Sequence, residues 1–212
     1  DVDQSKVDAL NGGASYLGHI SDADIAKAVA TGLFEATTDV TRCAEVDAVI
    51  IAVPTPLTKY RDPDLSYVTS TCQNIAPHLK RGAMVILEST TFPGTSAEVM
   101  KPILEAGSGM TVGDGIDLAY SPEREDPGNP NFKTENIPKV VGGDGDDARE
   151  LACAMYNQIV VSTIPVSSIE VAEAVKLTEN IFRAVNIAMV NELKIIYDKM
   201  GIDIWEVIEA AK

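Results

Sequence analysis

The sequence predicts an α/β protein in which a doubly wound parallel sheet is followed by a long helix. Short apolar runs rich in β-branched residues, such as Ala48 to Val53, alternate with helical segments along residues 1–167. This alternation is typical of a parallel sheet that helices cover on both faces. Residues 168–200 contain neither Gly nor Pro, so we expect one helix of about 50 Å at 1.5 Å per residue. Such a helix is longer than one domain, and we expect it to lead into a second domain.

Hydrophobic periodicity gives the order of the elements along the chain. Helices are expected near residues 4–11, 22–31, 39–45, 66–79, 94–106 and 146–157, before the long one. Strands are expected at residues 33–36, 48–53, 84–87, 116–120, 139–142 and 159–163. The chain is therefore divided into a sheet domain, residues 1–167, and a second part, residues 168–212, with the long central helix and the start of a middle domain.

Composition excludes several classes of function. The chain has 212 residues and 45% hydrophobic content, enough to bury the core of one large domain. A net charge of −15 argues against a nucleic-acid partner, because phosphates would be repelled. No apolar run approaches the roughly 20 residues of a membrane span. Three scattered cysteines and two histidines predict neither a disulfide framework nor a metal site, so the cytoplasm is the expected compartment.

The long helix carries a cation and an amide four residues apart, Lys176 and Asn180. This spacing puts both side chains on one face of the helix. They are set against an apolar stripe made of Val171, Val175, Ile181, Val185, Ala188, Met189, Leu193 and Ile196. An ammonium and an amide on one face could stabilise a carbonyl or alkoxide oxygen. Taken alone, such a pair is far more often a solvated surface feature than a catalytic one.

Asp1 stands directly before a predicted helix, where the carboxyl end of a strand would lie. In Rossmann-like dinucleotide folds an acidic residue at this place binds the ribose hydroxyls. The alternative role is that of an ordinary helix N-cap. The glycine fingerprint GxGxxG is absent from the sequence and would fall about 20 residues upstream of such an acid. Since the chain also starts without Met and stops inside a helical pattern, we expect it to be part of a longer protein.

Polar turns follow two neighbouring strands, at the edge where open parallel sheets bind ligands. The first apolar strand ends in Val53, Pro54 and Thr55, a rigid turn with a hydroxyl group. The alternative is a plain tight exit from the strand. The next strand runs into Ser89 to Thr91, shortly before a predicted helix, where hydroxyl and N–H groups suit an anion or a carboxamide. An ordinary helix cap is the other interpretation of these residues.

A third strand end, near residue 120, leads into the charged segment SPEREDPGNP, residues 121–130. Such a segment is usually a solvated loop. A carboxylate that proline-stiffened backbone holds over the ligand edge of a sheet can also act as a general base, and Glu123 is the candidate.

Six segments together resemble the UDP-glucose/GDP-mannose dehydrogenase family. They are DVDQSKVDALN, AVPTP, ESTTFPGT, SPEREDPGNP, KVVGG and the helix EVAEAVKLTENIFRAVNIAMVNEL. Their order and spacing follow the family over essentially the whole chain, which corresponds to about half of a family member. STTFPGT together with SPEREDPGN is most similar to the branch that acts on UDP-N-acetylglucosamine, although the UDP-glucose and UDP-N-acetylmannosamine branches are close.

The resemblance implies an NAD-dependent enzyme that oxidises the C6 alcohol of a nucleotide sugar to a carboxylate in two steps, for polysaccharide biosynthesis. The first 167 residues would then be an NAD-binding domain without its first strand and phosphate loop. Because the apolar stripe of the long helix would favour association, we also expect a homodimer formed through the central helix. The family's nucleophilic cysteine would lie beyond the end of this chain. We expect structural roles for Cys43, Cys72 and Cys153, which match no such motif.

Individual roles follow from the same resemblance. Asp1 and the segment Val53, Pro54 and Thr55 match cofactor contacts, as do Ser89 and Thr90. Thr90 and Glu123 match family residues that lie near the reacting carbon. The Glu123 carboxylate would assist water in thioester hydrolysis. Lys176 and Asn180 match the pair that stabilises the developing oxyanion.

Two other interpretations remain at this point. The β-hydroxyacid dehydrogenases also have a Lys-x-x-x-Asn pair on a long helix after a dinucleotide domain, but they do not account for SPEREDPGNP or the run from Ser89 to Thr95. Alternatively, the isolated chain is an inactive piece or a dimerisation module, since it contains neither phosphate loop nor nucleophile.

Overall fold

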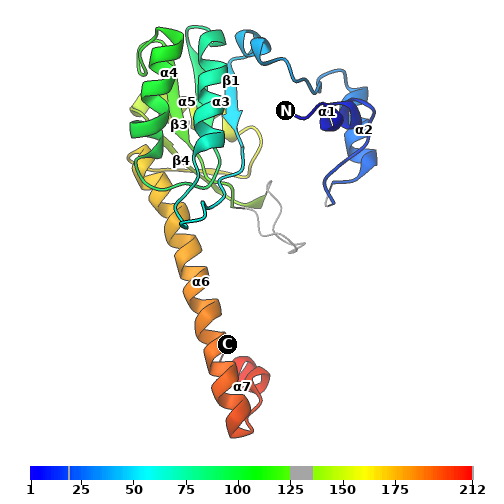
Figure 1. Ribbon diagram of the computed structural model, residues 1–212, viewed down its shortest axis with the longest axis vertical. Coiled ribbons are helices and arrows are strands. Elements are labelled where there is room, and N and C mark those ends of the chain that lie inside the picture. Colours follow the sequence, from blue (N-terminus) through cyan, green and yellow to red (C-terminus); the bar gives the residue numbers. More distant parts are fainter. Residues whose placement is uncertain (19, 125–135, 212) are drawn as a thin grey trace.

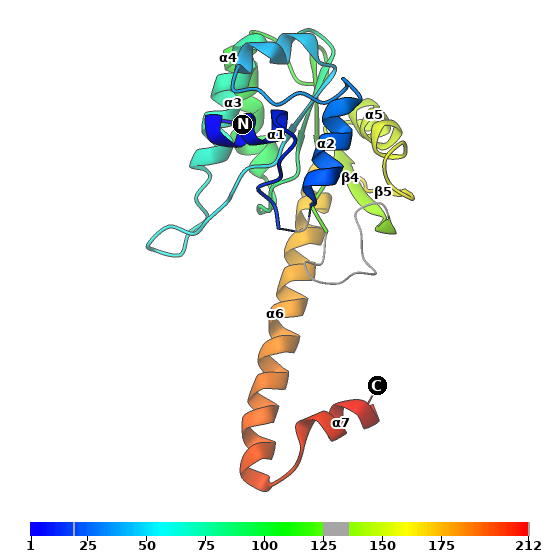
Figure 2. The ribbon, with the colours of Figure 1, turned by 90° about the vertical axis from the view of Figure 1, so that its right-hand side faces the viewer.

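The computed structural model describes residues 1–18, 20–124 and 136–211. An α/β layered body lies at one end, and a single long helix, α6 (Ile169–Met200), extends from it as a stalk (Figure 1). Its 32 residues span about 48 Å at 1.5 Å per residue. At the far end of the stalk the chain reverses, and α7 (Ile204–Ala211) projects to one side of α6 (Figure 2). No helix of the described residues has both the length and the apolar character needed to cross a membrane.

The remaining elements follow the predicted alternation. The other α-helices are α1 (Gln4–Asn11), α2 (Asp22–Ala30), α3 (Ser66–Ile75), α4 (Lys101–Ser108) and α5 (Asp146–Tyr156). Shorter helical turns are η1 (Val40–Glu45), η2 (Ala76–His78) and η3 (Thr95–Met100). The strands are β1 (Ala48–Ile51), β2 (Ala83–Leu87), β3 (Ile116–Tyr120), β4 (Lys139–Gly143) and β5 (Thr163–Pro165).

The described strands form one sheet in the order β1-β2-β3-β4-β5. β1, β2 and β3 are parallel, and β4 and β5 are parallel to each other, but β4 runs antiparallel to β3. The predicted doubly wound α/β class is thus confirmed. The sheet is mostly parallel, and the prediction of parallel pairing is wrong only between β3 and β4 among the described strands. Because Tyr120 pairs with Gly142, the reversal places Lys139, the first residue of β4, beyond the carboxyl end of β3.

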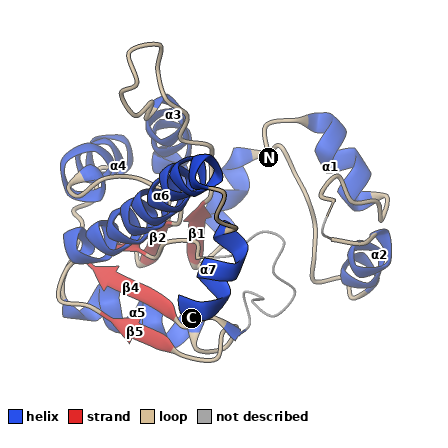
Figure 3. Ribbon diagram, turned by 90° about the horizontal axis from the view of Figure 1, so that it is seen from below, coloured by secondary structure: helices blue, strands red, loops and turns tan. Residues whose placement is uncertain are grey.

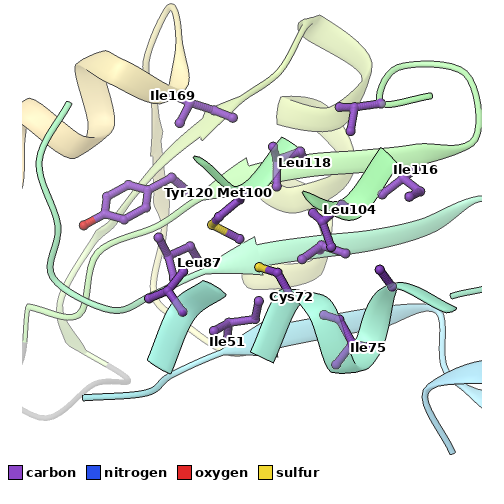
Figure 4. Close-up of a cluster of buried hydrophobic side chains, with 14 of the residues drawn as sticks. Ile51, Cys72, Ile75, Leu87, Met100, Leu104, Ile116, Leu118, Tyr120 and Ile169 are labelled. Atoms are coloured by element: carbon purple, nitrogen blue, oxygen red, sulfur yellow. The ribbon is translucent and has the colours of Figure 1, made fainter. Parts of the chain in front are cut away.

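Helices cover both faces of the sheet (Figure 3). One face packs against α3, α4 and the first turn of α6 through a core that includes Leu87, Leu118 and Tyr120 (Figure 4). The other face packs against α5, with Ile86 and Tyr156 among its buried residues. Alternate residues of β2 therefore face opposite cores, as the two-residue period of a strand requires.

The glycines of the KVVGG segment allow two helices to approach β4. A Cβ atom on Gly142 would lie 2.4 Å from the carbonyl oxygen of Ser168, the N-cap residue of α6. On Gly143 it would lie 2.3 Å from the backbone nitrogen of Arg149 in α5. Both distances are far inside van der Waals contact, so any larger side chain would push the helices away from the sheet.

The strand expected at residues 33–36 is absent. Instead, the Asn11 side chain takes the place of a neighbouring strand: its Nδ2 donates to the carbonyl of Ala36 at 2.8 Å and its Oδ1 accepts from the Ala36 N–H at 2.9 Å. The segment lies with α1 and α2, which stand beyond β1 and apart from the sheet (Figure 1). With no strand beside it, Leu33 is 94% exposed.

Other boundaries differ for local reasons. The last strand is β5 (Thr163–Pro165) and not residues 159–163, because the N–H groups of Ile159 and Val160 bond to the carbonyl of Tyr156 and continue the turn after α5. The helix expected over residues 94–106 begins as the π-helical η3 and becomes α-helical at Lys101. The segment near 39–45 forms the 3₁₀ helix η1.

Candidate active site

The ends of β1 and β2 are joined by the Ser89 hydroxyl. Ser89 Oγ accepts from the Val53 N–H at 2.9 Å and donates to the Val53 carbonyl at 2.7 Å. Nearby, the Thr55 hydroxyl donates to the carbonyl of Thr90 at 2.8 Å. The two polar turns predicted from the sequence therefore lie together at the carboxyl edge of the sheet.

These bonds determine which groups a ligand can reach. Both backbone groups of Val53 bond to Ser89, and Pro54 has no N–H to offer. Ser89 itself is buried, while the Thr90 side chain is exposed. The exposed Thr90 and the half-buried Thr55 together form a polar surface that suits a carboxamide or a ribose hydroxyl. A dinucleotide at this edge would therefore contact Thr55 and Thr90 more than Val53.

The helix that follows Thr91 already has an anion at its start. Glu173, from the second turn of α6, accepts from the Gly94 N–H at 2.7 Å and from the Ser96 N–H at 2.9 Å. The Ser96 hydroxyl donates to the same carboxylate at 2.8 Å. Gly94 reaches this geometry with a left-handed φ of 99°, which favours glycine. The sequence predicts an anion or carboxamide at this helix terminus, and the structure fills it with the protein's own carboxylate.

The burial of Glu173 is complete, since its relative exposure is 0%. Burial raises the pKa of this carboxyl above its usual value, and the hydrogen bonds from Ser96 and Gly94 oppose that rise. The N-terminal end of a helix carries partial positive charge, which compensates the carboxylate.

The long helix meets the charged segment at Lys176. Its Nζ donates to the backbone carbonyl of Glu123. The Glu123 N–H donates to the carbonyl of Glu88 at 3.4 Å. Glu123 therefore lies beside Glu88, the residue that precedes Ser89 at the end of β2. Arg124 forms an ion pair with Glu179 of α6 at 2.6 Å and donates to the carbonyl of Pro138 at 2.8 Å. The structure thus brings the backbone of Glu123 and the side chain of Lys176 together.

Desolvation lowers the pKa of Lys176 below its ordinary value, although the carboxylates of Glu179 and Glu123 act in the opposite direction. Asn180 is half-buried one turn further along α6. Among the described residues its side chain has no hydrogen-bond partner, so its amide is available in this part of the structure. A cation held against a carbonyl and a nearby amide are suitable donors for an oxyanion.

A buried ion pair, not foreseen from the sequence, lies beside Glu123. Lys139 Nζ is 2.9 Å from Glu88 Oε1, and the Tyr156 hydroxyl donates to the same oxygen at 2.6 Å. Burial and the Glu88 carboxylate raise the pKa of Tyr156. Lys139 also lies 4.8 Å from the centre of the Tyr156 ring. Lys139 and Glu123 line the same small pocket, which only the antiparallel direction of β4 allows.

Asp1 lies apart from these residues. Its terminal ammonium group donates to the Thr37 carbonyl at 3.0 Å, and its carboxylate accepts from the Asp3 N–H at 2.9 Å. Asp3, not Asp1, is the N-cap of α1. The N-terminus lies to the side of β1 (Figure 1), so the structure does not bring Asp1 to the strand ends where Ser89 and Thr90 lie.

One part of the predicted charged segment, from Glu125 to Pro130, lies outside the described residues.

The three cysteines are free thiols in this structure, and burial raises the pKa of Cys72 to about 12. Within the described ranges no group of His, Cys, Asp and Glu side chains could hold a metal ion.

An open, mostly parallel sheet with polar turns at the carboxyl ends of adjacent strands defines a dinucleotide-binding α/β domain. Comparison with known proteins identifies the family. Its NAD binding domain model matches residues 1–160, and its central domain model matches residues 170–212. The chain belongs to the UDP-glucose/GDP-mannose dehydrogenase family.

Individual relatives agree with this assignment. The chain is 35% identical over 212 residues to the UDP-N-acetyl-D-glucosamine 6-dehydrogenase of Pseudomonas aeruginosa, covering 100% of this chain and 50% of that protein. A UDP-D-ManNAc dehydrogenase from Pyrococcus horikoshii superposes with a TM-score of 0.92 at 33% identity, over 100% of this chain and 50% of that one. A ternary complex of GDP-mannose dehydrogenase from Pseudomonas aeruginosa superposes with a TM-score of 0.92 at 28% identity, over 99% of this chain and 49% of that one.

The chain therefore spans about half the length of the relatives it matches. The family match confirms NAD as the predicted cofactor. Because it covers both the sheet domain and the long helix, it favours this family over the β-hydroxyacid dehydrogenases.

Proposed function

We propose that the protein containing this chain is an NAD-dependent dehydrogenase that oxidises the C6 alcohol of a nucleotide sugar to a carboxylate in two steps. One observation carries the proposal: Lys176 of the long helix is bonded to Glu123 at the carboxyl edge of the sheet. This contact joins the two parts of the chain at the place where a dinucleotide fold binds its ligands. The names of the relatives, which act on UDP-N-acetyl-D-glucosamine, UDP-D-ManNAc and GDP-mannose, support a nucleotide sugar as substrate.

Each residue has a role that its chemistry supports. Lys176 and Asn180 donate hydrogen bonds to the oxyanion that develops on the sugar carbon. The Glu123 carboxylate assists a water molecule during hydrolysis of the thioester, which requires that it lie within one water of the carbonyl. The exposed hydroxyl of Thr90 contacts both the cofactor and the region of the reacting carbon.

The cofactor residues are Asp1, Ser89 and the turn Val53, Pro54 and Thr55, together with Thr90. When bound, NAD accepts the hydride from the sugar. Thr55 and Thr90 orient it through their hydroxyl groups, while Ser89 acts indirectly by fixing the turn. Asp1 would bind the ribose hydroxyls through its carboxylate, which in this structure accepts a hydrogen bond from the Asp3 N–H.

We assign residues 1–167 to the NAD-binding domain and residues 168–212 to the central helix with the start of the middle domain. The free thiols favour a reducing compartment, the cytoplasm. A second copy of the chain would pack on the exposed apolar face of α6, where the stripe that includes Ile181, Val185 and Met189 is about half exposed. Phe182, which is 72% exposed, lies beside that stripe. In the full-length protein Phe182→Glu should convert a dimer to a monomer in sedimentation.

The activity is tested on the full-length gene product with NAD and a panel of UDP-sugars and 3-hydroxy acids. We expect NADH from one or more UDP-sugars, with two NADH per sugar, and none from the hydroxy acids. NADH from 3-hydroxy acids alone would contradict the proposal. The isolated chain should bind NAD poorly in calorimetry, and micromolar affinity would contradict the expectation that its cofactor site is incomplete.

A further inference from the structure

The buried carboxylate of Glu173 has no part in the proposed chemistry, yet it connects both halves of the site. Two backbone N–H groups and one hydroxyl, from Gly94 and Ser96, donate to its two oxygens. Within the described residues it has no ion-pair partner, so its charge is balanced by hydrogen bonds and the helix terminus.

Its place on α6 relates it to the catalytic face. Lys176 follows three residues after Glu173 and Asn180 seven residues after it, so all three share one side of the helix. The residues that donate to Glu173, Gly94 and Ser96, lie shortly after Thr90 and Thr91 in the chain. The carboxylate therefore fixes the helix with the oxyanion donors against the loop with the proposed cofactor contact.

We propose that Glu173 is a positioning residue that sets the rotation and height of α6, and hence where Lys176 presents its ammonium group. This inference rests on the proposed function. Because its two oxygens accept from separate N–H groups, 2.7 and 2.9 Å away, the carboxylate resists both rotation and sliding of the helix. An apolar side chain of similar volume would fill the space without these directional bonds.

The choice of a charged group here supports a geometric role. Burying a carboxylate costs free energy, and well-packed apolar residues at such places often give equal or greater stability. Burial raises the pKa of Glu173, which reflects that cost. The hydrogen bonds from Gly94 and Ser96 to both carboxylate oxygens instead fix the orientation of α6. The contact of Lys176 with Glu123 requires that orientation.

The test compares Glu173→Gln with Glu170→Gln in the full-length enzyme. Glu170 is exposed on the first turn of the same helix, so it controls for loss of a charge. A displacement of about 1 Å can cost about 100-fold in rate, so we expect Glu173→Gln to lower kcat by about 10- to 100-fold. The KM for NAD and the kcat of Glu170→Gln should stay within about twofold.

A double variant separates positioning from a merely structural role. If Glu173 acts through Lys176, adding Glu173→Gln to Lys176→Ala should lower kcat by less than about twofold further, because coupled residues are not additive. Should Glu173→Gln fail to fold, Ser96→Ala removes only the hydroxyl bond and should show a smaller loss of kcat in the same direction. In either soluble variant, amide exchange reports the same contact: the Gly94 N–H should exchange faster than in the wild type.

The possible results are distinct. An active wild type with unchanged kcat in Glu173→Gln, or a fully additive loss in the double variant, would overturn this inference alone. A wild type that oxidises no nucleotide sugar would overturn the proposed function and this inference with it.

Discussion

Replacing Ser89 with Ala should loosen the junction between β1 and β2 at the ligand edge. The substitution removes two hydrogen bonds, one of 2.9 Å from the Val53 N–H and one of 2.7 Å to the Val53 carbonyl. At about 0.5–1.5 kcal/mol for each neutral hydrogen bond, the free energy of unfolding should fall by about 1–3 kcal/mol. For a chain of this size, a loss near 2 kcal/mol corresponds to about 4–8 °C in Tm.

Urea unfolding of the 212-residue chain, followed by circular dichroism, measures this loss. Thr90→Ala is the matched control, because the Thr90 side chain is exposed and the bond from Thr55 reaches its backbone carbonyl. The control should change the free energy of unfolding by less than about 0.5 kcal/mol. Equal stabilities for Ser89→Ala and the wild type would refute the reasoning that the Ser89 hydroxyl joins the two strand ends.

Three further outcomes follow from the structure. Cys72, fully buried with a pKa near 12, should react with a disulfide reagent only after unfolding; labelling of all three thiols in the native chain would contradict this. Gly142→Ala, whose Cβ would lie 2.4 Å from the Ser168 carbonyl, should lower the urea midpoint through a loss of about 1–3 kcal/mol, and an unchanged midpoint would argue against the close approach of α6. Because the pKa of Lys176 is lowered from 10.5, kcat should fall as pH rises through a midpoint below that value, as the ammonium loses its proton. In Lys176→Arg this alkaline limb should move to higher pH, and an identical limb would assign the titration to another group.

The sequence was sufficient for features that depend on local patterns. Apolar runs gave the central strands, and the Gly- and Pro-free stretch gave α6. The residues after each strand also placed Thr55, Ser89 and Glu123 at one edge, because the carboxyl ends of parallel strands converge; only the family resemblance placed Lys176 of α6 in the same site.

Features set by distant partners could not be found in this way. The Asn11 side chain replaces a strand neighbour at Ala36, and nothing local distinguishes it from a surface Asn. The direction of β4, which brings Lys139 to the ligand edge, depends on a register between separate segments.

Glu173 was missed although a signal existed. It shares a helix face with Ile169 and Ala172, which are both buried, whereas Val171 in the predicted stripe is 40% exposed. A carboxylate among buried residues at the start of a helix indicates a buried partner, and the N–H groups after Thr91, which the sequence offers to an anion or a carboxamide, are its donors.

The kcat of Lys176→Ala in the full-length enzyme tests the central claim most directly. Lys194→Ala is the control, since Lys194 is exposed on the same helix. Loss of one oxyanion donor should lower kcat by about 100-fold or more with the best UDP-sugar, while the control stays near the wild type. A decrease of less than about tenfold would remove Lys176 from the chemistry and contradict the proposed role of the contact between α6 and Glu123.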